Sequence, residues 1–149
     1  MNEIEHKYLV DPVLWEKIEK SKPELIVQGF ISKSVESTVR IRIKGTQGFL
    51  TIKGKTTGIT RSEFEYEIPV KDAEEMLAQF TVKQIRKYRY EILVGKHTWE
   101  VDVFEGRLQG LILAELEVES EDEAFELPEW VTDDVSRDPA YYNAVLIDR

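Results

Sequence analysis

Acidic and basic side chains recur at every second residue in several segments of the sequence. The acidic sets are Glu3 and Glu5, which precede Lys7; Glu63, Glu65 and Glu67; Glu100 and Asp102; and Glu115, Glu117 and Glu119. The basic sets are Arg40 and Arg42, Lys53, and Lys87 and Arg89. Carboxylates are the ligands that hard divalent cations prefer, whereas guanidinium and ammonium groups bind phosphate oxygens. If both kinds face one space, the ligand that satisfies them is a chain of phosphates with Mg²⁺ or Mn²⁺.

A spacing of two residues places alternate side chains on opposite faces of a β-strand. In residues 38–44, Arg40 and Arg42 share one face and three aliphatic residues occupy the other. The same alternation predicts eight strands, near residues 3–9, 25–32, 38–44, 49–55, 62–70, 86–94, 98–106 and 113–120. The connections at 44–48 and 94–98 are short and contain glycine. Short connections indicate antiparallel neighbours in a meander or barrel.

Four segments are predicted to be helical and to lie outside the strands: residues 11–21, 72–80, 120–125 and 137–147. The first and the last contain Asp-Pro, in which Asp can cap a helix and Pro suits its first turn. Asp72 is the expected cap of the second segment. No repeat or linker interrupts the chain, so we expect one domain over residues 1–149.

Composition excludes several classes of function. The 149 residues include no cysteine, which rules out disulfides and thiolate metal sites. The net charge of −9 argues against nucleic acid or an anionic membrane as a partner. No apolar run approaches the roughly 20 residues of a membrane span, and no signal-peptide pattern is present, so a cytoplasmic protein is expected. Three or four short helices leave apolar strand faces to be covered, and a homodimer would supply that cover.

The charged strand faces have two interpretations that the residues alone leave open. They can face water on one side of an antiparallel sheet. Like charges two residues apart repel each other there, and glutamate is a poor strand former. Alternatively, eight strands can close into a barrel just wide enough for a small ligand, with the charges inside. Carboxylates of the first and eighth strands could then meet, and every buried charge would have to be paired or bound to metal.

The ordered set of motifs resembles the CYTH superfamily, the triphosphate tunnel metalloenzymes. The motifs are EIEHKYL, RIR, TIK, EFE, KYR, EVDVFEG, LAELEVE and a terminal YYNAVLI, and together they cover essentially the whole chain. The sequence looks closest to short bacterial inorganic triphosphatases. This resemblance implies a mainly β (α+β) fold: an eight-stranded antiparallel closed barrel, or tunnel, with a charged interior and a few helices outside. It also implies metal-dependent hydrolysis of inorganic triphosphate.

The resemblance assigns roles to residues of this chain. One or two Mg²⁺ or Mn²⁺ ions would be bound by residues drawn from Glu3, Glu5, Glu63, Glu65, Asp102, Glu115 and Glu117. The triphosphate would be bound by Lys7, Arg40, Arg42, Lys53, Lys87 and Arg89. Catalytic roles fall to Lys7, Glu63 and Glu65, the two acids through a second metal that activates water. Some of these relatives carry a tyrosine after the Gln-Gly of the second strand. Phe30 stands there in this chain, so any assistance of the water is expected from Lys7.

Three alternatives compete with this function. The first is a class IV-type adenylate cyclase or a thiamine triphosphatase of the same fold, although no stretch clearly builds a pocket for a nucleobase or thiamine. The second is a non-catalytic polyphosphate-binding module, which would favour losing the metal carboxylates that this chain retains. The third is a barrel with solvated charged strands and an unrelated partner. An assay that compares tripolyphosphate, ATP and thiamine triphosphate separates the enzymatic alternatives.

Overall fold

A computed structural model describes all 149 residues, and β-strands account for most of its regular structure. The strands are β1 (Asn2–Val10), β2 (Glu24–Lys33), β3 (Ser37–Lys44), β4 (Gln47–Gly54), β5 (Thr60–Ile68), β6 (Gln84–Val94), β7 (His97–Phe104), β8 (Ile112–Val118) and β9 (Val131–Asp134). The α-helices are α1 (Pro12–Lys17), α2 (Val70–Phe80) and α3 (Asn143–Leu146), and the 3-10 helices are η1 (Gly106–Leu108) and η2 (Pro139–Tyr141). The mainly β class is confirmed.

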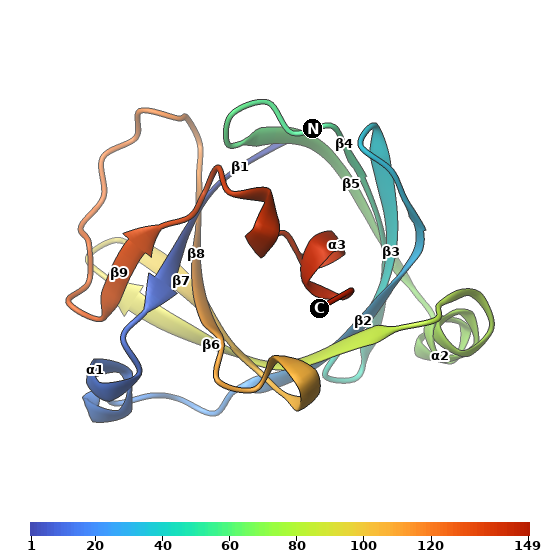
Figure 1. Cartoon of the computed structure of the whole chain (residues 1–149), viewed down its shortest axis with the longest axis horizontal. Helices are drawn as coiled ribbons and strands as arrows, with labels where there is room; N and C mark the ends of the chain where they lie inside the picture. Colours follow the sequence, from blue (N-terminus) through green and yellow to red (C-terminus); the bar gives the residue numbers. More distant parts are fainter.

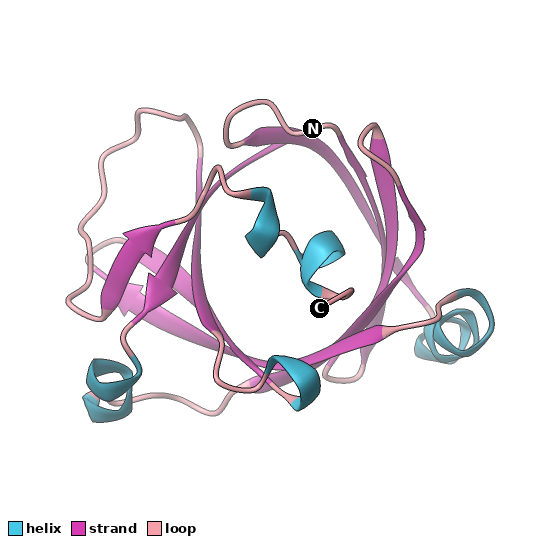
Figure 2. Cartoon of the chain, viewed as in Figure 1, coloured by secondary structure: helices cyan, strands magenta, loops and turns pink.

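Eight strands close into an antiparallel barrel. Their order is β5-β4-β3-β2-β6-β7-β8-β1, and β1 pairs with β5 to complete the ring. This closing pair runs from Asn2 opposite Ser62 to Ile4 opposite Thr60. Figure 2 shows the ring in a view along its opening. The prediction of an eight-stranded closed barrel is therefore confirmed. The short β9, which pairs with the far end of β1, was not predicted.

Outward-facing apolar residues form two separate cores. The larger one joins residues of β1, β7 and β8 to α1 and to the segment before β9, with Trp15, Trp99 and Trp130 in edge-to-face contact. The smaller one packs Ile41 of β3 against Ala73 and Leu77 of α2. Figure 1 places α1 and α2 outside the ring, on opposite sides. Both helices thus bury the aliphatic faces that strand alternation turns outward.

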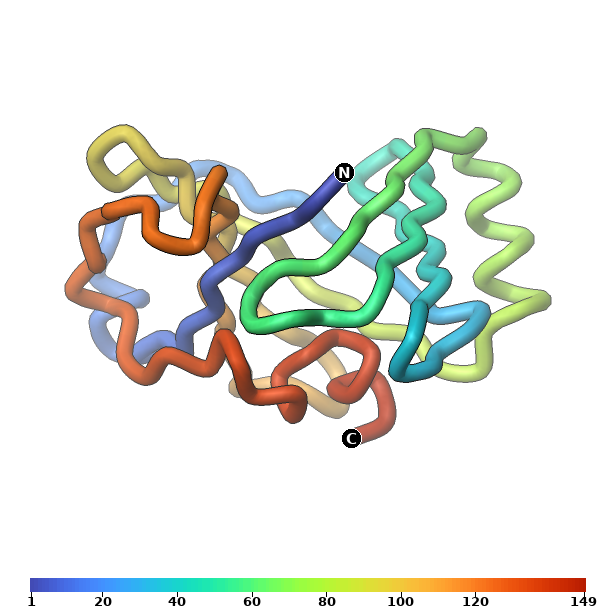
Figure 3. Tube along the Cα trace, turned by 90° about the horizontal axis from the view of Figure 1, so that it is seen from above, coloured from blue at the N-terminus to red at the C-terminus, as the bar shows by residue number.

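A third core lies inside one end of the barrel. Ile85, Phe104 and Leu113 point inward and pack against Leu146 and Ile147 of the C-terminal segment. Figure 1 shows α3 within the outline of the ring, and Figure 3 shows that the C-terminal segment occupies one end of it. The expectation that the helices lie outside is therefore correct for α1 and α2 but wrong for the C-terminal segment. Apolar residues on the inner face explain the difference, because they need cover from within.

The predicted helix boundaries need three corrections. The first helix is capped by Asp11 as expected but ends at Lys17 rather than residue 21, since Ile18 is extended. The second begins at Val70, so Asp72 lies in its first turn and Pro69 is at the cap. Residues 120–125 form no helix, because Ser120 and Glu123 use their side chains in local hydrogen bonds that compete with helical ones.

The C-terminal segment also differs from its prediction. Instead of one helix over residues 137–147, it forms η2 and then α3, separated by extended backbone at Tyr142. Asp138 caps η2, in agreement with the Asp-Pro pattern. None of the helices is long and apolar enough to cross a membrane.

Candidate functional site

A cavity of about 800 Å³ runs through the barrel. It is lined by twelve of the thirteen residues selected from the sequence: Glu3, Glu5, Lys7, Arg40, Arg42, Lys53, Glu63, Glu65, Lys87, Arg89, Glu115 and Glu117. Asp102 is the exception, since it is only 1% exposed and lies behind the cavity wall. These twelve charged residues come from six strands and converge on one space, which excludes the interpretation of a solvated outer face for this set.

Antiparallel register explains which of these side chains meet. Lys53 on β4 is directly opposite Glu63 on β5, and Arg89 on β6 is opposite Asp102 on β7. Lys7 on β1 is opposite Glu115 on β8. Directly opposed residues on one face of an antiparallel pair have neighbouring Cβ atoms. The sorting of charge by strand thus places acids beside bases across each of these pairs.

The most buried ion pairs join β1, β6, β7 and β8. Arg89 donates from Nε to Asp102 Oδ1 at 2.7 Å and from Nη2 to Glu115 Oε1 at 3.0 Å. Lys87 Nζ lies 2.7 Å from Asp102 Oδ2. Lys7 Nζ lies 3.5 Å from Glu115 Oε2. Asp102 therefore has both oxygens occupied by cations that reach the cavity, and it holds them in place.

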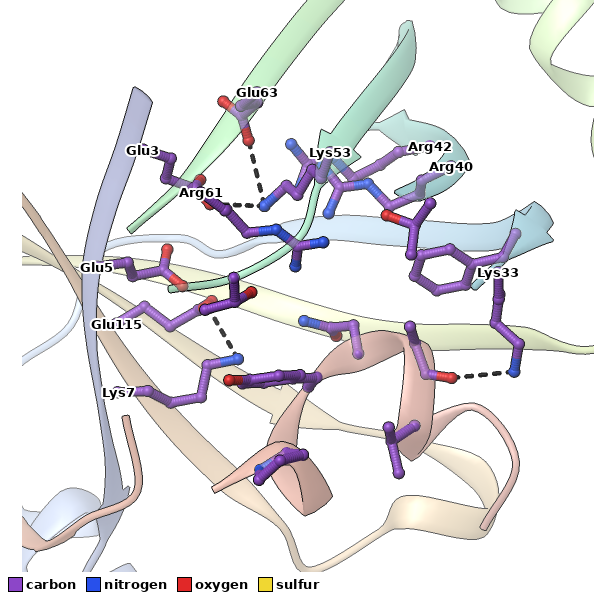
Figure 4. A pocket seen from close by; sticks show the side chains of 18 of the residues that line it. Glu3, Glu5, Lys7, Lys33, Arg40, Arg42, Lys53, Arg61, Glu63 and Glu115 are labelled. Atoms are coloured by element: carbon purple, nitrogen blue, oxygen red, sulfur yellow. Dashed lines mark hydrogen bonds and ion pairs between the residues drawn. The ribbon is translucent and has the colours of Figure 1, made fainter. Parts of the chain in front are cut away.

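The second group of ion pairs lies on the wall formed by β3, β4 and β5. Arg42 donates to Glu65 at 3.3 Å, and Arg40 lies 3.6 Å from the same oxygen. Thr51 donates to that carboxylate at 2.8 Å. Nearby, Lys53 bridges Glu3 at 2.8 Å and Glu63 at 3.2 Å, as Figure 4 shows. Arg40, Arg42 and Lys53 are thus already paired with acids, as are Glu63 and Glu65 with bases.

Neighbouring carboxylates in the cavity have opposite pKa shifts. Burial raises the pKa of Glu5 well above its usual value, and the adjacent Glu115 and Glu3 raise it further. Burial opposes ionisation of Glu115 too, but Lys7 and Arg89 outweigh it and hold the pKa of Glu115 well below its usual value. The negative charge of Glu5 is thus only partly compensated within the protein, by Lys7.

The two buried lysines, Lys7 and Lys87, also have opposite pKa shifts. Burial favours the neutral form of Lys7, but Glu115 and Glu5 outweigh it and raise its pKa. Burial lowers the pKa of Lys87 to about 8 despite the attraction of Asp102. Lys7 would need a lowered pKa to accept a proton from water, so its environment favours phosphate binding over that role.

The C-terminal segment, which holds the terminal YYNAVLI motif, contributes groups that were not among the candidate site residues. Lys7 Nζ donates to the Tyr141 carbonyl at 3.1 Å, and Lys87 Nζ donates to Asn143 Oδ1 at 3.2 Å. Tyr142 and Asn143 line the cavity. Their contacts join positions far apart in the sequence, so no local pattern could have assigned them.

Arg61, Lys55 and Lys33 also line the cavity and were missed. Arg61 precedes Glu63 by two residues and shares its face of β5, so the alternation already contained the signal for this residue. Lys33 contacts Asp148 and donates to the Ala144 carbonyl at 3.0 Å. Lys55 lies in the connection after β4, where alternation does not apply.

The carboxylates suit a hard divalent cation in chemistry, although no three of them converge on one point. Lys53 holds Glu3, and Lys7 and Arg89 hold Glu115, which separates their oxygens. Glu5 lies beside both acids, and its raised pKa reflects negative charge that a cation would neutralise. An all-oxygen donor set of this kind fits Mg²⁺ or Mn²⁺.

Comparison with known proteins gives consistent matches along the chain. The CYTH domain family matches residues 1–144. An inorganic triphosphatase of Acetivibrio thermocellus is 40% identical over 146 residues, which cover 97% of this chain and 92% of that protein. An inorganic triphosphatase of Nitrosomonas europaea is 33% identical over 150 residues, covering 98% and 97%. The solved structure of the inorganic triphosphatase NE1496 has a TM-score of 0.67 at 30% identity, covering 97% of this chain and 93% of that one.

Proposed function

The chain belongs to the CYTH domain family, and from this membership and the barrel interior we propose that it hydrolyses inorganic triphosphate with a divalent metal ion. The main support for this proposal is the cavity, in which cations of β1, β3, β4 and β6 face carboxylates of β1, β5 and β8. A triphosphate would bind the cations while a metal ion takes carboxylates that now pair with them. Substrate and metal together thus replace the internal ion pairs.

The metal ion, Mg²⁺ or Mn²⁺, would be held by Glu3, Glu5 and one or both of Glu115 and Glu117. A second ion would be held near Glu63 and Glu65. When bound, such ions polarise phosphate oxygens and lower the pKa of an attacking water. Asp102 was also a candidate ligand, but both of its oxygens contact Lys87 and Arg89. We propose that it positions these two cations.

The basic residues would hold the substrate in line for attack by water. Arg40, Arg42 and Lys53 extend from one wall, and Lys7, Lys87 and Arg89 from the opposite one. They would neutralise the charge that develops on the phosphate oxygens in the transition state. Because the strands fix their register, little reorganisation is needed during the reaction. Water would attack a terminal phosphorus and displace pyrophosphate, so that one triphosphate gives one orthophosphate and one pyrophosphate.

The direct test measures phosphate release from tripolyphosphate by the purified protein with Mg²⁺ or Mn²⁺, with ATP and thiamine triphosphate assayed in parallel. We expect tripolyphosphate to be the preferred substrate and Glu5→Gln to lower kcat/KM at least about 100-fold. Glu19→Gln, on an exposed residue outside the barrel, is the matched control. Absence of phosphate release with either metal contradicts the proposal. Formation of cyclic AMP and pyrophosphate from ATP favours the cyclase alternative, and tight binding without turnover favours a binding module.

We also propose that the protein forms a homodimer through the outer face of β4 and β5. The side chains of Ile52, Phe64 and Tyr66 are 39%, 48% and 57% exposed there. The backbone of β4 and β5 is already hydrogen-bonded within the barrel, so a second copy would cover this face through side-chain contacts. Light scattering on wild type and Phe64→Ser tests this, and a monomeric wild type would contradict it. A single domain over residues 1–149 and a cytoplasmic location stay predictions, to be tested by limited proteolysis and cell fractionation.

A further inference from the structure

Thr51 of β4 places a buried hydroxyl group behind the wall of the cavity. Its side chain has no exposed surface and does not line the cavity. The strand register puts it between two residues of the site, since Thr51 is opposite Arg40 on β3 and opposite Glu65 on β5. Directly opposed residues on one face of antiparallel strands have neighbouring Cβ atoms. A single short side chain therefore lies between a proposed substrate cation and a proposed metal ligand.

The hydroxyl of Thr51 is hydrogen-bonded on both sides. It donates to Glu65 Oε2 at 2.8 Å and accepts from Arg40 Nη2 at 3.3 Å. A hydroxyl has one proton to donate and lone pairs that accept, so both bonds can exist together. Threonine is branched at Cβ, which restricts rotation about χ1 and fixes the direction of the hydroxyl. Thr51 thus links the guanidinium to the carboxylate through a side chain with little freedom of its own.

The carboxylate of Glu65 is bound through only one of its two oxygens. Oε2 accepts from the Thr51 hydroxyl at 2.8 Å and from Arg42 Nη2 at 3.3 Å, and Arg40 Nη2 lies 3.6 Å away. Oε1 has no hydrogen bond or ion pair within the protein. Glu65 lines the cavity, and its side chain is 33% exposed. Oε1 is therefore the oxygen that remains for a cation.

The guanidinium of Arg40 depends on Thr51 for its only hydrogen bond to the protein. Its ion pair with Glu65 is long, at 3.6 Å, and its Nε has no hydrogen-bond partner. Burial, together with the adjacent Arg42, lowers the pKa of Arg40 to about 9. Glu65 thus compensates the positive charge of Arg40 only in part, and an anionic substrate would compensate the rest. The Thr51 hydroxyl sets the direction in which that charge points.

We propose that Thr51 is a positioning residue, which holds Glu65 Oε2 so that Oε1 is free for a divalent cation and which orients Arg40 toward the triphosphate. The inference rests on the proposed function and adds a residue that touches neither substrate nor metal. When substrate binds, Arg40 and Arg42 bind phosphate oxygens in place of Glu65. The buried hydroxyl does not reach the substrate, so its bond to Glu65 persists and keeps the carboxylate in place.

The hydroxyl also limits how the arginines pair with Glu65 before substrate arrives. It occupies Oε2, which keeps Arg42 and Arg40 on that one oxygen. Without the hydroxyl, the carboxylate can rotate and the two guanidinium groups can take both of its oxygens. A metal ion would then have to displace a guanidinium from Glu65, and a triphosphate would meet an Arg40 that has lost its orientation. Removal of the hydroxyl should therefore weaken the binding of both ligands.

The experiment compares wild type with Thr51→Val, Thr51→Ser and Thr51→Ala. Valine has nearly the shape of threonine but lacks the hydroxyl. Serine and alanine both lack the methyl group and differ from each other only in the hydroxyl, so this pair isolates the same effect if the valine variant does not fold. The control is Thr98→Val, on an exposed residue of β7 that does not line the cavity.

Two calorimetric titrations measure binding without turnover: Mn²⁺ alone, and tripolyphosphate in the presence of EDTA. For Thr51→Val and Thr51→Ala we expect each Kd to rise about 5-fold or more, the size of one lost hydrogen bond. In assays with tripolyphosphate, the half-saturating concentration of Mg²⁺ should rise by a similar factor. Thr51→Ser should keep most of both affinities, and Thr98→Val should match wild type.

The outcomes distinguish failure of this inference from failure of the proposed function. If wild type neither binds nor hydrolyses tripolyphosphate, the proposed function fails and the role of Thr51 fails with it. If wild type does both and the alanine variant keeps both Kd values, only the role of Thr51 is overturned, even if its melting temperature is lower. Equal losses for Thr51→Ser and Thr51→Ala also overturn it, because the hydroxyl would then have no part in the effect.

Discussion

The barrel interior has a charged section and an apolar section built on the same strands and the same strand face. In each of four strands an ionised residue lies two positions from an apolar one: Lys7 and Leu9 on β1, Lys87 and Ile85 on β6, Asp102 and Phe104 on β7, and Glu115 and Leu113 on β8. The charged members border or support the cavity. The apolar members lie in or against the core that includes Leu146 and Ile147.

This difference shows that facing inward does not by itself decide the environment of a side chain. The groups that surround it decide its environment, because the charged residues meet opposite charges on nearby strands and the apolar ones meet the C-terminal segment. The apolar section also excludes water from one end of the cavity. A drier environment strengthens the neighbouring ion pairs, and it raises the cost of leaving any charge there unpaired. The two sections therefore depend on each other.

The largest effect should come from removing the buried acid of the charged section. Asp102→Asn leaves Lys87 and Arg89 without the carboxylate that binds both. Breaking a buried ion pair from one side costs about 3–5 kcal/mol. Urea unfolding should show this loss, and activity should fall as well, since both cations reach the cavity.

The control for Asp102 is Asp133→Asn, on an exposed residue of β9. The double variant Asp102→Asn with Lys87→Met removes one of the stranded charges and should recover part of the stability. A loss below about 1 kcal/mol for Asp102→Asn would show that the charged section does not depend on internal pairing.

A somewhat smaller effect is expected in the apolar section. Leu146 is fully buried on α3, and Leu146→Ala should cost about 2–4 kcal/mol through lost burial and a new cavity. Because Leu146 does not line the charged cavity, KM for tripolyphosphate should change less than stability does. Unfolding and kinetics on the same samples measure both quantities.

Val145→Ala is the matched control for Leu146, since Val145 is the preceding residue of α3 and is 43% exposed. It should alter stability by less than about 1 kcal/mol. Equal losses for the two variants would mean that α3 does not seal the barrel through Leu146, and the distinction between the sections would weaken.

The pH dependence of stability should separate Glu5 from Glu115 within the charged section. The pKa of Glu5 is raised in the folded protein, so Glu5 stabilises the fold at low pH, and this contribution is lost as pH rises from about 4.5 through its folded pKa. In metal-free protein, Glu5→Gln should therefore gain stability relative to wild type between pH 4 and pH 8. Denaturant unfolding in EDTA at both pH values measures this difference.

The contribution of Glu115 to stability changes with pH in the opposite direction. Its pKa is lowered in the folded protein, so its stabilisation is present above the ordinary value of 4.5 and is lost as pH falls through the folded pKa. Glu115→Gln should be destabilised at pH 8, and the loss should shrink in acid. If both variants change in the same direction with pH, the proposed electrostatic difference between these neighbours is wrong.

The smallest effect is expected at the exposed end of the C-terminal segment. Asp148 pairs with Lys33, and both side chains are largely solvent-accessible. Exposed pairs contribute little to stability and are screened by salt. Asp148→Asn should leave the melting temperature nearly unchanged at 0.15 M salt. A loss as large as that of Leu146→Ala would mean that charge, rather than apolar packing, holds the segment in the barrel.

Much of the barrel could be predicted because alternation is a local signal. The strand expected at residues 38–44 is Ser37–Lys44 in the structure, and the one at 49–55 lies within one or two residues of Gln47–Gly54. The helix expected at residues 120–125 was wrong, because side-chain hydrogen bonds around Ser120 and Glu123 compete with a short helix that little packing supports. Short elements depend on tertiary contacts that composition does not reveal.

For the candidate site too, local alternation predicted which residues face inward but not the contacts that they make in the folded chain. Alternation selected the twelve lining residues together with Asp102, but it could not tell that Asp102 lies behind Lys87 and Arg89. It contained the signal for Arg61, which shares the inward face of β5 with Glu63 and lines the cavity. Tyr142 and Asn143 belong to the terminal YYNAVLI motif, but the motif gave them no role in the site, since their place in the cavity depends on where the chain's end packs.

The sequence by itself determined which side chains share a face, because a strand turns alternate residues to opposite sides whatever surrounds it. Tertiary structure decided that these faces enclose a cavity, which acid pairs with which base, and that the C-terminal segment enters the barrel. The physical reason is that ion pairing and burial depend on contacts between elements far apart in the sequence, such as Lys7 with Glu115 or Leu113 with Leu146. The pairing of β1 with β8 and the packing of α3 inside the barrel set those distances, and no local pattern encodes them.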